Sequence, residues 1–220
     1  MTSENQPASR RDRRRIETQE RLFDAALTLL CERDFDAVTI EMITEAADVG
    51  KGTFFNYFKN KEAVIVAYFE RIRGHLIESL QTPDDAAPEP MERNLNLPGP
   101  VWKQIVLTTH KLAEVEGRSH RLTRTLFSLS LTNDAVREAH QRLGEEVGAS
   151  ANTLMRFGQA TGEFRADAEP AALGQFIGCI YQSALYDWAL KESEEPLEIA
   201  LMRSLTLAWE AIRSREVAGG

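Results

Sequence analysis

The feature that most constrains the fold of this chain is the stretch from Thr39 to Lys61, TIEMITEAADVGKGTFFNYFKNK. It opens on a threonine, a residue type that caps helix N-termini, and apolar residues follow at helical spacing. Residues 48–50, Asp-Val-Gly, then supply a turn in which the glycine is free to adopt unusual backbone angles. A second short helix is expected over residues 51–58. The stretch therefore predicts two short helices joined by a tight turn.

The second short helix is expected to have an aromatic inner face and a polar outer face. Between residues 49 and 61 the chain has three lysines and no acidic residue, although its net charge is -8. Lysine, threonine, asparagine and tyrosine are donors that reach phosphates and base edges. This pattern fits a helix-turn-helix unit whose second helix enters the DNA major groove. An ordinary helical hairpin with solvated lysines fits it as well. The expected core residues are Phe54, Phe55 and Phe58.

Residues 40–63, and above all the run VGKGTFFNYFKNKE over residues 49–62, resemble the TetR family of one-component bacterial regulators. The likeness extends upstream to Ile16 and downstream through the helix that follows the motif. The resemblance implies an all-α fold of nine to ten helices. It implies a three-helix, N-terminal helix-turn-helix domain and a larger C-terminal helical domain that binds a ligand and dimerises.

The same resemblance implies a set of residues that contact double-stranded operator DNA. Lysine donates well to guanine, asparagine can pair with adenine, and a threonine methyl can contact the thymine methyl. Two positions depart from the family pattern: Phe55 stands where many members have a phosphate-contacting tyrosine, and Glu41 stands where some have a base-reading arginine. The implied phosphate contacts are Thr39, Tyr57 and Lys61, and the implied base-edge positions are Lys51, Gly52, Thr53 and Asn56.

The domain organisation follows from the same reading. We expect a disordered basic arm over residues 1–15, a TetR-type helix-turn-helix domain over 16–62 with the motif at 39–58, and an effector-binding and dimerisation domain over 63–220. Residues 10–15 read RRDRRR, five arginines and one aspartate with a net charge of +4. Such a block can be a solubilising tail, or an arm that touches the DNA backbone or minor groove.

Helical periodicity predicts the remaining elements, and no stretch alternates long enough to predict a strand. An apolar stripe on the first helix is expected to include Ile16, Phe23 and Leu27. Residues 81–100 hold five of the eight prolines and are expected to form a loop. The predicted helices cover residues 16–33, 61–80, 101–116, 120–131, 134–159, 170–191 and 197–215, besides the two short helices of the motif.

Two further surfaces are expected in the C-terminal part. The last two predicted helices are rich in apolar residues, which can form intrachain core or a four-helix interface in a homodimer; the resemblance favours the dimer. A pocket for a small apolar organic effector is expected among the predicted helices between residues 101 and 191, although aromatic residues at helical spacing are often simply core. The interface candidates are Phe176, Ile180, Trp188, Leu201, Leu205 and Ile212. The pocket candidates are Trp102, His110, Phe127, Met155, Phe157, Cys179 and Tyr181.

Several classes of function are disfavoured. The four histidines are dispersed, and none lies at metal-ligand spacing from another His or Cys, so we expect no metal and no cofactor. The chain lacks the GxSxG, Walker A, HExxH and GxGxxG motifs, so we expect no enzyme. No apolar run approaches the ~20 residues of a membrane span, and the N-terminus lacks the apolar core of a signal peptide. A cytoplasmic protein with no membrane partner is expected.

The leading hypothesis is a homodimeric, sequence-specific DNA-binding transcriptional regulator. In the preferred version of this hypothesis, the protein is a repressor that a small-molecule ligand releases from its operator. A transcriptional activator and a ligand-independent regulator are alternatives within the same class. An alternative from another class is a helical adaptor that binds protein partners and no operator. A protein-binding face tends to be more apolar than the polar residues predicted on the second short helix.

Overall fold

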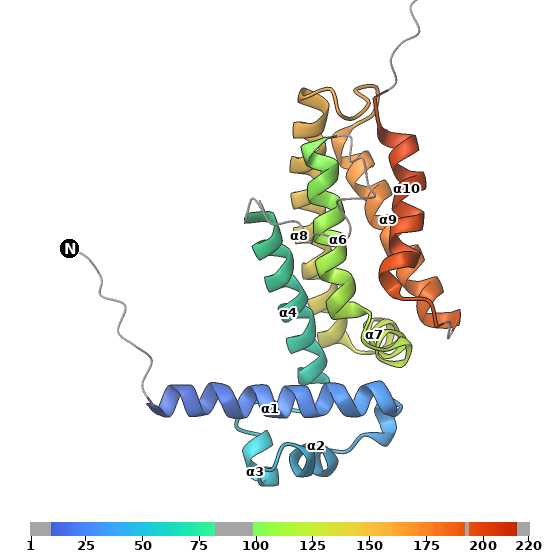
Figure 1. The fold of residues 1–220 in the computed structure, drawn as a ribbon. Helices are drawn as coiled ribbons and strands as arrows, with labels where there is room; N and C mark the ends of the chain where they lie inside the picture. The colour runs from blue at the N-terminus through green and yellow to red at the C-terminus, as the bar shows by residue number, and fades with distance from the viewer. Residues whose placement is uncertain (1–9, 82–98, 192–193, 215–220) are drawn as a thin grey trace, which may run out of the picture. The chain divides into compact units, whose positions relative to one another are not determined.

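The computed structural model describes residues 10–81, 99–191 and 194–214, and these residues are helical almost throughout (Figure 1). The chain divides into two compact units, residues 1–65 and residues 66–220. Helix α4 (Glu62–Gln81) begins in the first unit and continues in the second. The predicted all-α fold is confirmed for the described residues.

The first unit contains α1 (Arg10–Glu32), the 3-10 turn η1 (Phe35–Ala37), α2 (Ile40–Ala46), α3 (Lys51–Phe54) and the start of α4. Helices α2 and α3 lie beside the long α1 (Figure 1). All four helices bury apolar residues, and those of α1 lie along a stripe at helical spacing. The buried apolar residues of this unit are Leu22, Phe23, Ala26, Leu27, Leu30, Val38, Ile43, Ala47, Phe54, Phe58, Val64 and Ile65.

Helix α1 begins earlier than predicted. Residues 10–15 form its first turns and are exposed, so the predicted disordered arm over residues 1–15 is corrected at its C-terminal side. Residues 1–9 lie outside the described residues. Arginine is a good helix former, and Asp12 in the first turn suits the positive end of the helix dipole. Ile16 is exposed rather than part of the apolar stripe, because the buried residues of α1 begin only at Leu22.

The second unit is a helical bundle of α6 (Pro100–Glu116), α7 (His120–Thr132), α8 (Asp134–Ala160), α9 (Pro170–Lys191) and α10 (Leu197–Ile212), together with the rest of α4. Helix α9 packs against both α8 and α10, and α6 packs against α10 (Figure 1). The side chain of Ser119 caps α7, and the Oδ1 atom of Asn133 accepts a hydrogen bond from the Val136 N–H at 3.1 Å to cap α8.

A turn between α8 and α9 holds the start of α6. The two carboxylate oxygens of Glu163 accept hydrogen bonds from the backbone N–H groups of Val101, at 3.1 Å, and Trp102, at 2.7 Å. These N–H groups have no partner inside the helix, so the carboxylate acts as a remote N-cap. Phe164 and Arg213 form an isolated antiparallel bridge next to this cap. The C-terminal end of α10 is thereby attached to the same turn.

The proline-rich loop predicted over residues 81–100 lies mostly outside the described residues. None of the helices in the described part of the chain is long and apolar enough to span a membrane.

Candidate nucleic-acid interface and effector cavity

The turn between α2 and α3 is set by a left-handed residue. The N–H of Asp48 donates to the carbonyl of Glu45 at 3.1 Å, and the N–H of Val49 donates to the carbonyl of Thr44 at 3.0 Å. This is the Schellman pattern, which needs a residue with positive φ after the helix. Asp48 has φ 51°, whereas Gly50 has φ -71°. The expectation that the glycine takes the unusual angle is therefore wrong; aspartate can do so because its short polar side chain tolerates this region.

Helix α3 is shorter than predicted, and its aromatic residues divide between core and surface. The regular helix ends at Phe54, and a further turn-type hydrogen bond joins the Phe58 N–H to the Phe54 carbonyl at 2.9 Å. Phe54 and Phe58 are buried with ring centroids 5.6 Å apart, because residues four apart share one face. Phe55, the next residue along the chain, lies on a different face and is 52% exposed. Its predicted place in the core is therefore wrong.

The implied base-reading residues are accessible. Lys51, Gly52 and Asn56 are exposed, and Thr53 and Tyr57 are partly exposed. A helix that reads base edges must present such donors outward while its apolar residues hold it to the core.

Thr39 has a structural task as well as an implied phosphate contact. Its Oγ1 atom accepts a hydrogen bond from the Met42 N–H at 3.2 Å, which caps α2. A hydroxyl group can accept one hydrogen bond and donate another. The cap therefore leaves the hydroxyl proton free to donate to a phosphate oxygen.

An acidic residue from α2 pairs with the first residue of α3. The Nζ atom of Lys51 donates to Oε1 of Glu41, and both side chains remain more than half exposed. The hydrogen bond from Lys51 is the largest influence that lowers the pKa of the Glu41 carboxyl. The lysine-rich segment is therefore not free of negative charge in three dimensions. A surface ion pair of this kind contributes little to stability, so Lys51 can exchange it for DNA.

Lys61 is partly occupied within its own unit. Its Nζ atom donates to the carbonyl of Phe35 at 2.6 Å and to the carbonyl of Val38 at 2.7 Å, and it lies 4.3 Å from the centroid of the Phe35 ring. The ammonium group has three donors, and two of them hold the η1 segment in place. Sequence reasoning missed this role because the partners are backbone carbonyls more than twenty residues away.

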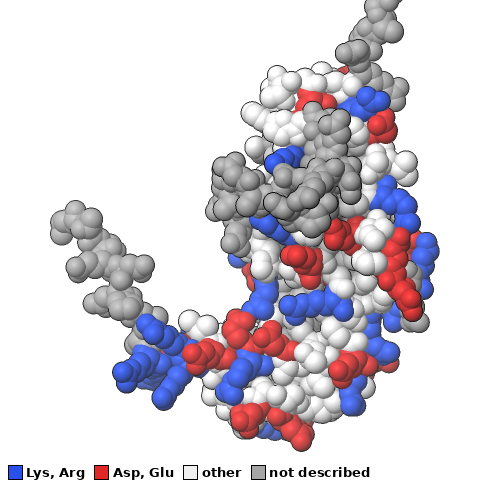
Figure 2. Space-filling model, viewed as in Figure 1, with Lys and Arg blue, Asp and Glu red and all other residues white. Residues whose placement is uncertain are grey.

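Basic residues also gather at the N-terminal end of α1 (Figure 2). This cluster consists of the exposed arginines 10, 11, 13, 14 and 15. They lie on a helix, so their spacing is fixed by the helix rather than by a flexible arm.

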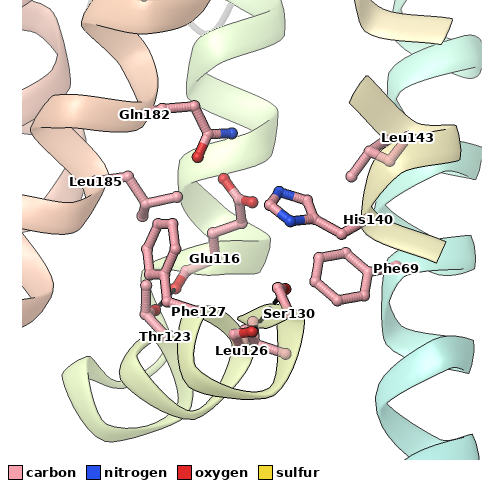
Figure 3. A pocket seen from close by; sticks show the side chains of 10 residues that line it. All are labelled: Phe69, Glu116, Thr123, Leu126, Phe127, Ser130, His140, Leu143, Gln182 and Leu185. Atoms are coloured by element: carbon pink, nitrogen blue, oxygen red, sulfur yellow. Dashed lines mark hydrogen bonds between the residues drawn. The ribbon is translucent and has the colours of Figure 1, made fainter. Parts of the chain in front are cut away.

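A cavity of about 30 Å³ lies in the second unit, where side chains of α4, α6, α7, α8 and α9 converge (Figure 3). Its walls combine two phenylalanine rings and three leucines with one carboxyl group, one imidazole, two hydroxyls and one amide. The lining residues are Phe69, Glu116, Thr123, Leu126, Phe127, Ser130, His140, Leu143, Gln182 and Leu185.

Only Phe127 of the predicted pocket residues lines this cavity. Trp102 and Met155 belong to a core cluster, in which the Trp102 and Trp209 rings are 5.0 Å apart. His110 lies against Glu198, with 3.0 Å between Nδ1 and Oε1. Helical spacing places these residues on an inner face, but it does not say which helix that face meets. The other predicted pocket residues do not line the cavity either. Phe157 and Cys179 are exposed, and the Tyr181 hydroxyl donates a hydrogen bond to Glu116, which does line it.

The polar centre of the cavity is Glu116 at the end of α6. The Tyr181 hydroxyl donates a hydrogen bond to its Oε2 atom. Burial raises the pKa of Glu116 to about 7, and the Tyr181 hydrogen bond opposes that rise. Burial, followed by the neighbouring Glu116, raises the pKa of Tyr181 well above its usual value, so Tyr181 remains a donor. The sequence carries no signal for this site, because a glutamate at a helix end usually lies at the surface.

His140 connects the cavity wall to α4. Its imidazole stacks on the Phe69 ring with 5.2 Å between centroids, and its side chain points toward Glu116 (Figure 3). Burial lowers the pKa of His140, so the ring is neutral at neutral pH. Ion pairs join the same two helices: Arg73 of α4 contacts Glu146 of α8 at 3.5 Å, and Arg142 of α8 contacts Glu70 of α4 at 3.7 Å.

The predicted dimer residues are mostly intrachain core. Trp188 is 5% exposed and Leu201 is 0% exposed, and Leu205 and Ile212 are likewise buried in the core of the second unit. Phe176 is partly exposed and so is Ile180. The predicted stripe on α10 is its inner face, since α10 packs that side onto α9 and α6. Other apolar residues of α9 and α10 are exposed instead: Tyr186, Leu190, Ile199 and Leu207.

Known proteins resemble the chain in sequence and in fold. Residues 22–68 match the family model described as bacterial regulatory proteins, tetR family. The HTH-type transcriptional repressor DhaR of Mycobacterium sp. (strain GP1) is 26% identical over 202 residues, which cover 90% of this chain and 93% of that protein.

Two solved structures cover almost all of the described fold. FadR of Thermus thermophilus, a TetR family transcriptional repressor solved with lauroyl-CoA, matches with a TM-score of 0.60 and 25% identity over 92% of this chain and 98% of that chain. FadR of Bacillus halodurans has a TM-score of 0.70 and 19% identity over 90% and 97% of the two chains, and it supports the fold alone. With the family match over the helix-turn-helix and whole-chain likeness beyond it, the chain belongs to the TetR family of bacterial transcriptional regulators.

Proposed function

We propose that the chain is a repressor that binds its operator as a homodimer and leaves it when a small organic molecule enters the second unit. TetR-family proteins are DNA-binding regulators rather than enzymes, so DNA binding follows from family membership. The observation that carries the proposal is that α3 and the turn after it have a buried face and an exposed face. Phe54 and Phe58 are buried and anchor the segment, whereas Lys51 and Asn56 face outward. DhaR is itself a repressor, which supports the sign of regulation.

The operator contacts are proposed on both short helices. Lys51, Gly52, Thr53 and Asn56 are placed at base edges, and the phosphate contacts are Thr39, Tyr57 and Lys61. Each good base contact contributes about 1–3 kcal/mol of discrimination, which is too little for one unit to find one site in a genome. Two copies of α3 on two half-sites supply the rest. Successive half-sites on one side of a duplex are about 34–36 Å apart.

The homodimer is proposed to form through α9 and α10. Phe176 and Ile180 of α9 stay in the proposal because they are at least partly exposed. The exposed apolar residues Tyr186, Leu190 and Leu207 replace the buried ones. An apolar surface on two adjacent helices suits a four-helix interface between two chains. The domain assignment of residues 16–62 to DNA binding and 63–220 to effector binding and dimerisation remains part of this proposal.

Helix α4 is proposed to couple the two sites. It carries Phe69, which lines the cavity and stacks on His140, and its first residues belong to the DNA-binding unit. A ligand that displaces Phe69 displaces α4, and the two reading helices then no longer match their half-sites. The ligand has this effect only if it binds the two arrangements of the dimer unequally. A cytoplasmic location is part of the proposal because the partner is DNA.

The test combines binding-site mapping with matched variants. Genome-wide mapping identifies bound fragments, and gel shifts on those fragments compare Lys51→Ala and Tyr57→Ala with Arg156→Ala. Arg156 is an exposed base on α8, so it controls for loss of one positive charge. We expect Lys51→Ala to weaken specific binding about tenfold. Arg156→Ala should stay within about twofold of the original chain.

The outcomes separate the candidate functions. Unchanged binding in both α3 variants removes the reading face from the proposal. Failure to bind any genomic fragment favours the helical adaptor instead. Transcripts of genes next to the bound sites decide the sign of regulation: they rise on deletion if the chain is a repressor and fall if it is an activator.

A further inference from the structure

The cavity of the second unit has an acidic end. None of its ten lining residues, all within the described part of the chain, is Lys or Arg. Glu116 provides the one carboxyl group, and the side chains of His140 and Gln182 point toward it (Figure 3). The pKa of His140 is lowered by burial, so the imidazole adds no positive charge at neutral pH.

Aromatic rings flank the acidic end. Phe69 of α4 and Phe127 of α7 both line the cavity. The Phe127 ring packs edge-on against Tyr186, with 5.2 Å between ring centroids, and Phe69 stacks on His140. A carboxylate together with the faces of aromatic rings is a combination that recognises organic cations, since each attracts positive charge.

We propose, on the basis of the function proposed above, that the effector is an organic amine whose protonated amino group binds Glu116 and whose apolar body packs against Phe69 and Phe127. Among the described lining residues, Glu116 carries the one acceptor group that can hold a negative charge, whereas Thr123, Ser130 and Gln182 offer neutral acceptors. The ammonium donates to the carboxylate oxygens alongside the hydroxyl of Tyr181.

An anionic effector fits this wall poorly. A carboxylate or the phosphates of an acyl-CoA would face Glu116 with no lining Lys or Arg to offset the repulsion. FadR of Thermus thermophilus was solved with lauroyl-CoA, so this chain and that relative are expected to differ in effector charge.

The size of the cavity links ligand entry to movement. A volume of about 30 Å³ holds little more than water, so an organic amine must push the walls apart. Phe69 forms the α4 side of the wall. Widening the cavity therefore acts on the helix that continues into the DNA-binding unit.

The test uses three probes that share one hydrocarbon body: 4-phenylbutylamine, 4-phenylbutanol and 4-phenylbutyrate. Binding to the full-length protein is measured by calorimetry near pH 8, without DNA. We expect the amine to bind about tenfold or more tightly than the alcohol, and the carboxylate to bind weakest. Equal binding of the three probes, or tighter binding of 4-phenylbutyrate or lauroyl-CoA, would overturn the proposal.

Two variants locate the effect. Glu116→Gln keeps the size and the acceptor for Tyr181 but removes the charge; we expect it to weaken amine binding about tenfold and to leave alcohol binding nearly unchanged. Glu114→Gln removes an exposed carboxylate from the same helix and should leave both affinities unchanged. Amine binding that survives Glu116→Gln contradicts the assignment.

The pH dependence supplies a second readout. The groups facing Glu116 are Tyr181 of α9, which stays protonated, and His140 of α8, which stays neutral near and above pH 7. The pKa of Glu116 is about 7, so amine affinity should rise from pH 6 to pH 8 and then fall as the amine loses its proton near pH 10. Glu116→Gln should abolish the rise.

Gel shifts on the mapped DNA fragments distinguish failure of this inference from failure of the proposed function. DNA binding without amine binding refutes the effector class alone, and absence of DNA binding refutes the proposed function.

Discussion

Asp48 occupies a backbone position that most residues avoid, since its φ is 51° and it ends α2 in a Schellman pattern. Glycine adopts this conformation without strain, although it also gains more freedom in the unfolded chain. We expect Asp48→Gly to raise the free energy of unfolding by roughly 0.5–1 kcal/mol and to preserve operator binding. Asp48→Ala, which removes the polar side chain but keeps the Cβ atom, should lower the free energy of unfolding. Urea denaturation of both variants checks the prediction, and a stabilised alanine variant would contradict the strain.

Glu116 gives the stability of the protein a specific pH dependence. Its pKa is about 7 in the folded protein, above the ordinary value of 4.5 that applies to the unfolded chain. Between these values the unfolded chain loses its proton first, so stability falls as pH rises through this window. Glu116→Gln should therefore raise the free energy of unfolding by roughly 1–3 kcal/mol near pH 8 and change it little near pH 4.

Denaturation of this variant at both pH values measures the difference. Glu114→Gln, on the exposed side of the same helix, should show no such pH-dependent gain. A Glu116→Gln variant that is less stable near pH 8 would mean that the carboxylate is stabilised by more than the Tyr181 hydroxyl. A stabilised variant that loses the amine cannot owe that loss to misfolding.

At the scale of elements, α6 depends on a cap that comes from a distant turn. Glu163 accepts hydrogen bonds from the N–H groups of Val101 and Trp102, and a Cβ atom on Gly99 would collide with its carboxyl group. We expect Glu163→Ala to lower the free energy of unfolding by about 1–2 kcal/mol. Glu169→Ala, six residues later and exposed, is the control. Equal unfolding midpoints for the two variants would show that α6 does not rely on this carboxylate.

The limits of prediction are also clearest at this scale. Helices α9 and α10 begin at Pro170 and Leu197 as predicted, because proline marks helix starts through its fixed φ and missing N–H. Helix α3 ends early and Phe55 is exposed, although the phenylalanine run suggested one aromatic face. Start signals are local and readable, whereas the exposure of one aromatic residue depends on which element covers it.

At the scale of the whole molecule, the homodimer interface is the main prediction. Leu207 of α10 is 72% exposed and Leu131 of α7 is 80% exposed, so the two provide a matched pair on different helices. We expect Leu207→Glu to produce monomers at micromolar concentration and to weaken operator binding, because two half-sites are needed. Leu131→Glu should remain dimeric. Sedimentation velocity measures both, and dimers in the Leu207→Glu variant would exclude the α9–α10 surface.

The motif over residues 39–61 and the helical periodicity were enough to predict an all-α chain with two short helices joined by a tight turn, because turn chemistry, capping and spacing act between near neighbours. The DNA-binding regulator was predicted from the resemblance of the same motif to the TetR family. The cavity, its acidic residue Glu116 and the inner position of Trp188 and Leu201 emerged only from the packed chain. A periodic stripe says that a helix has a buried face, but the partner of that face is chosen by contacts between residues far apart in sequence. Lys61 makes the same point, since the carbonyls it binds are brought to it only when the first unit folds.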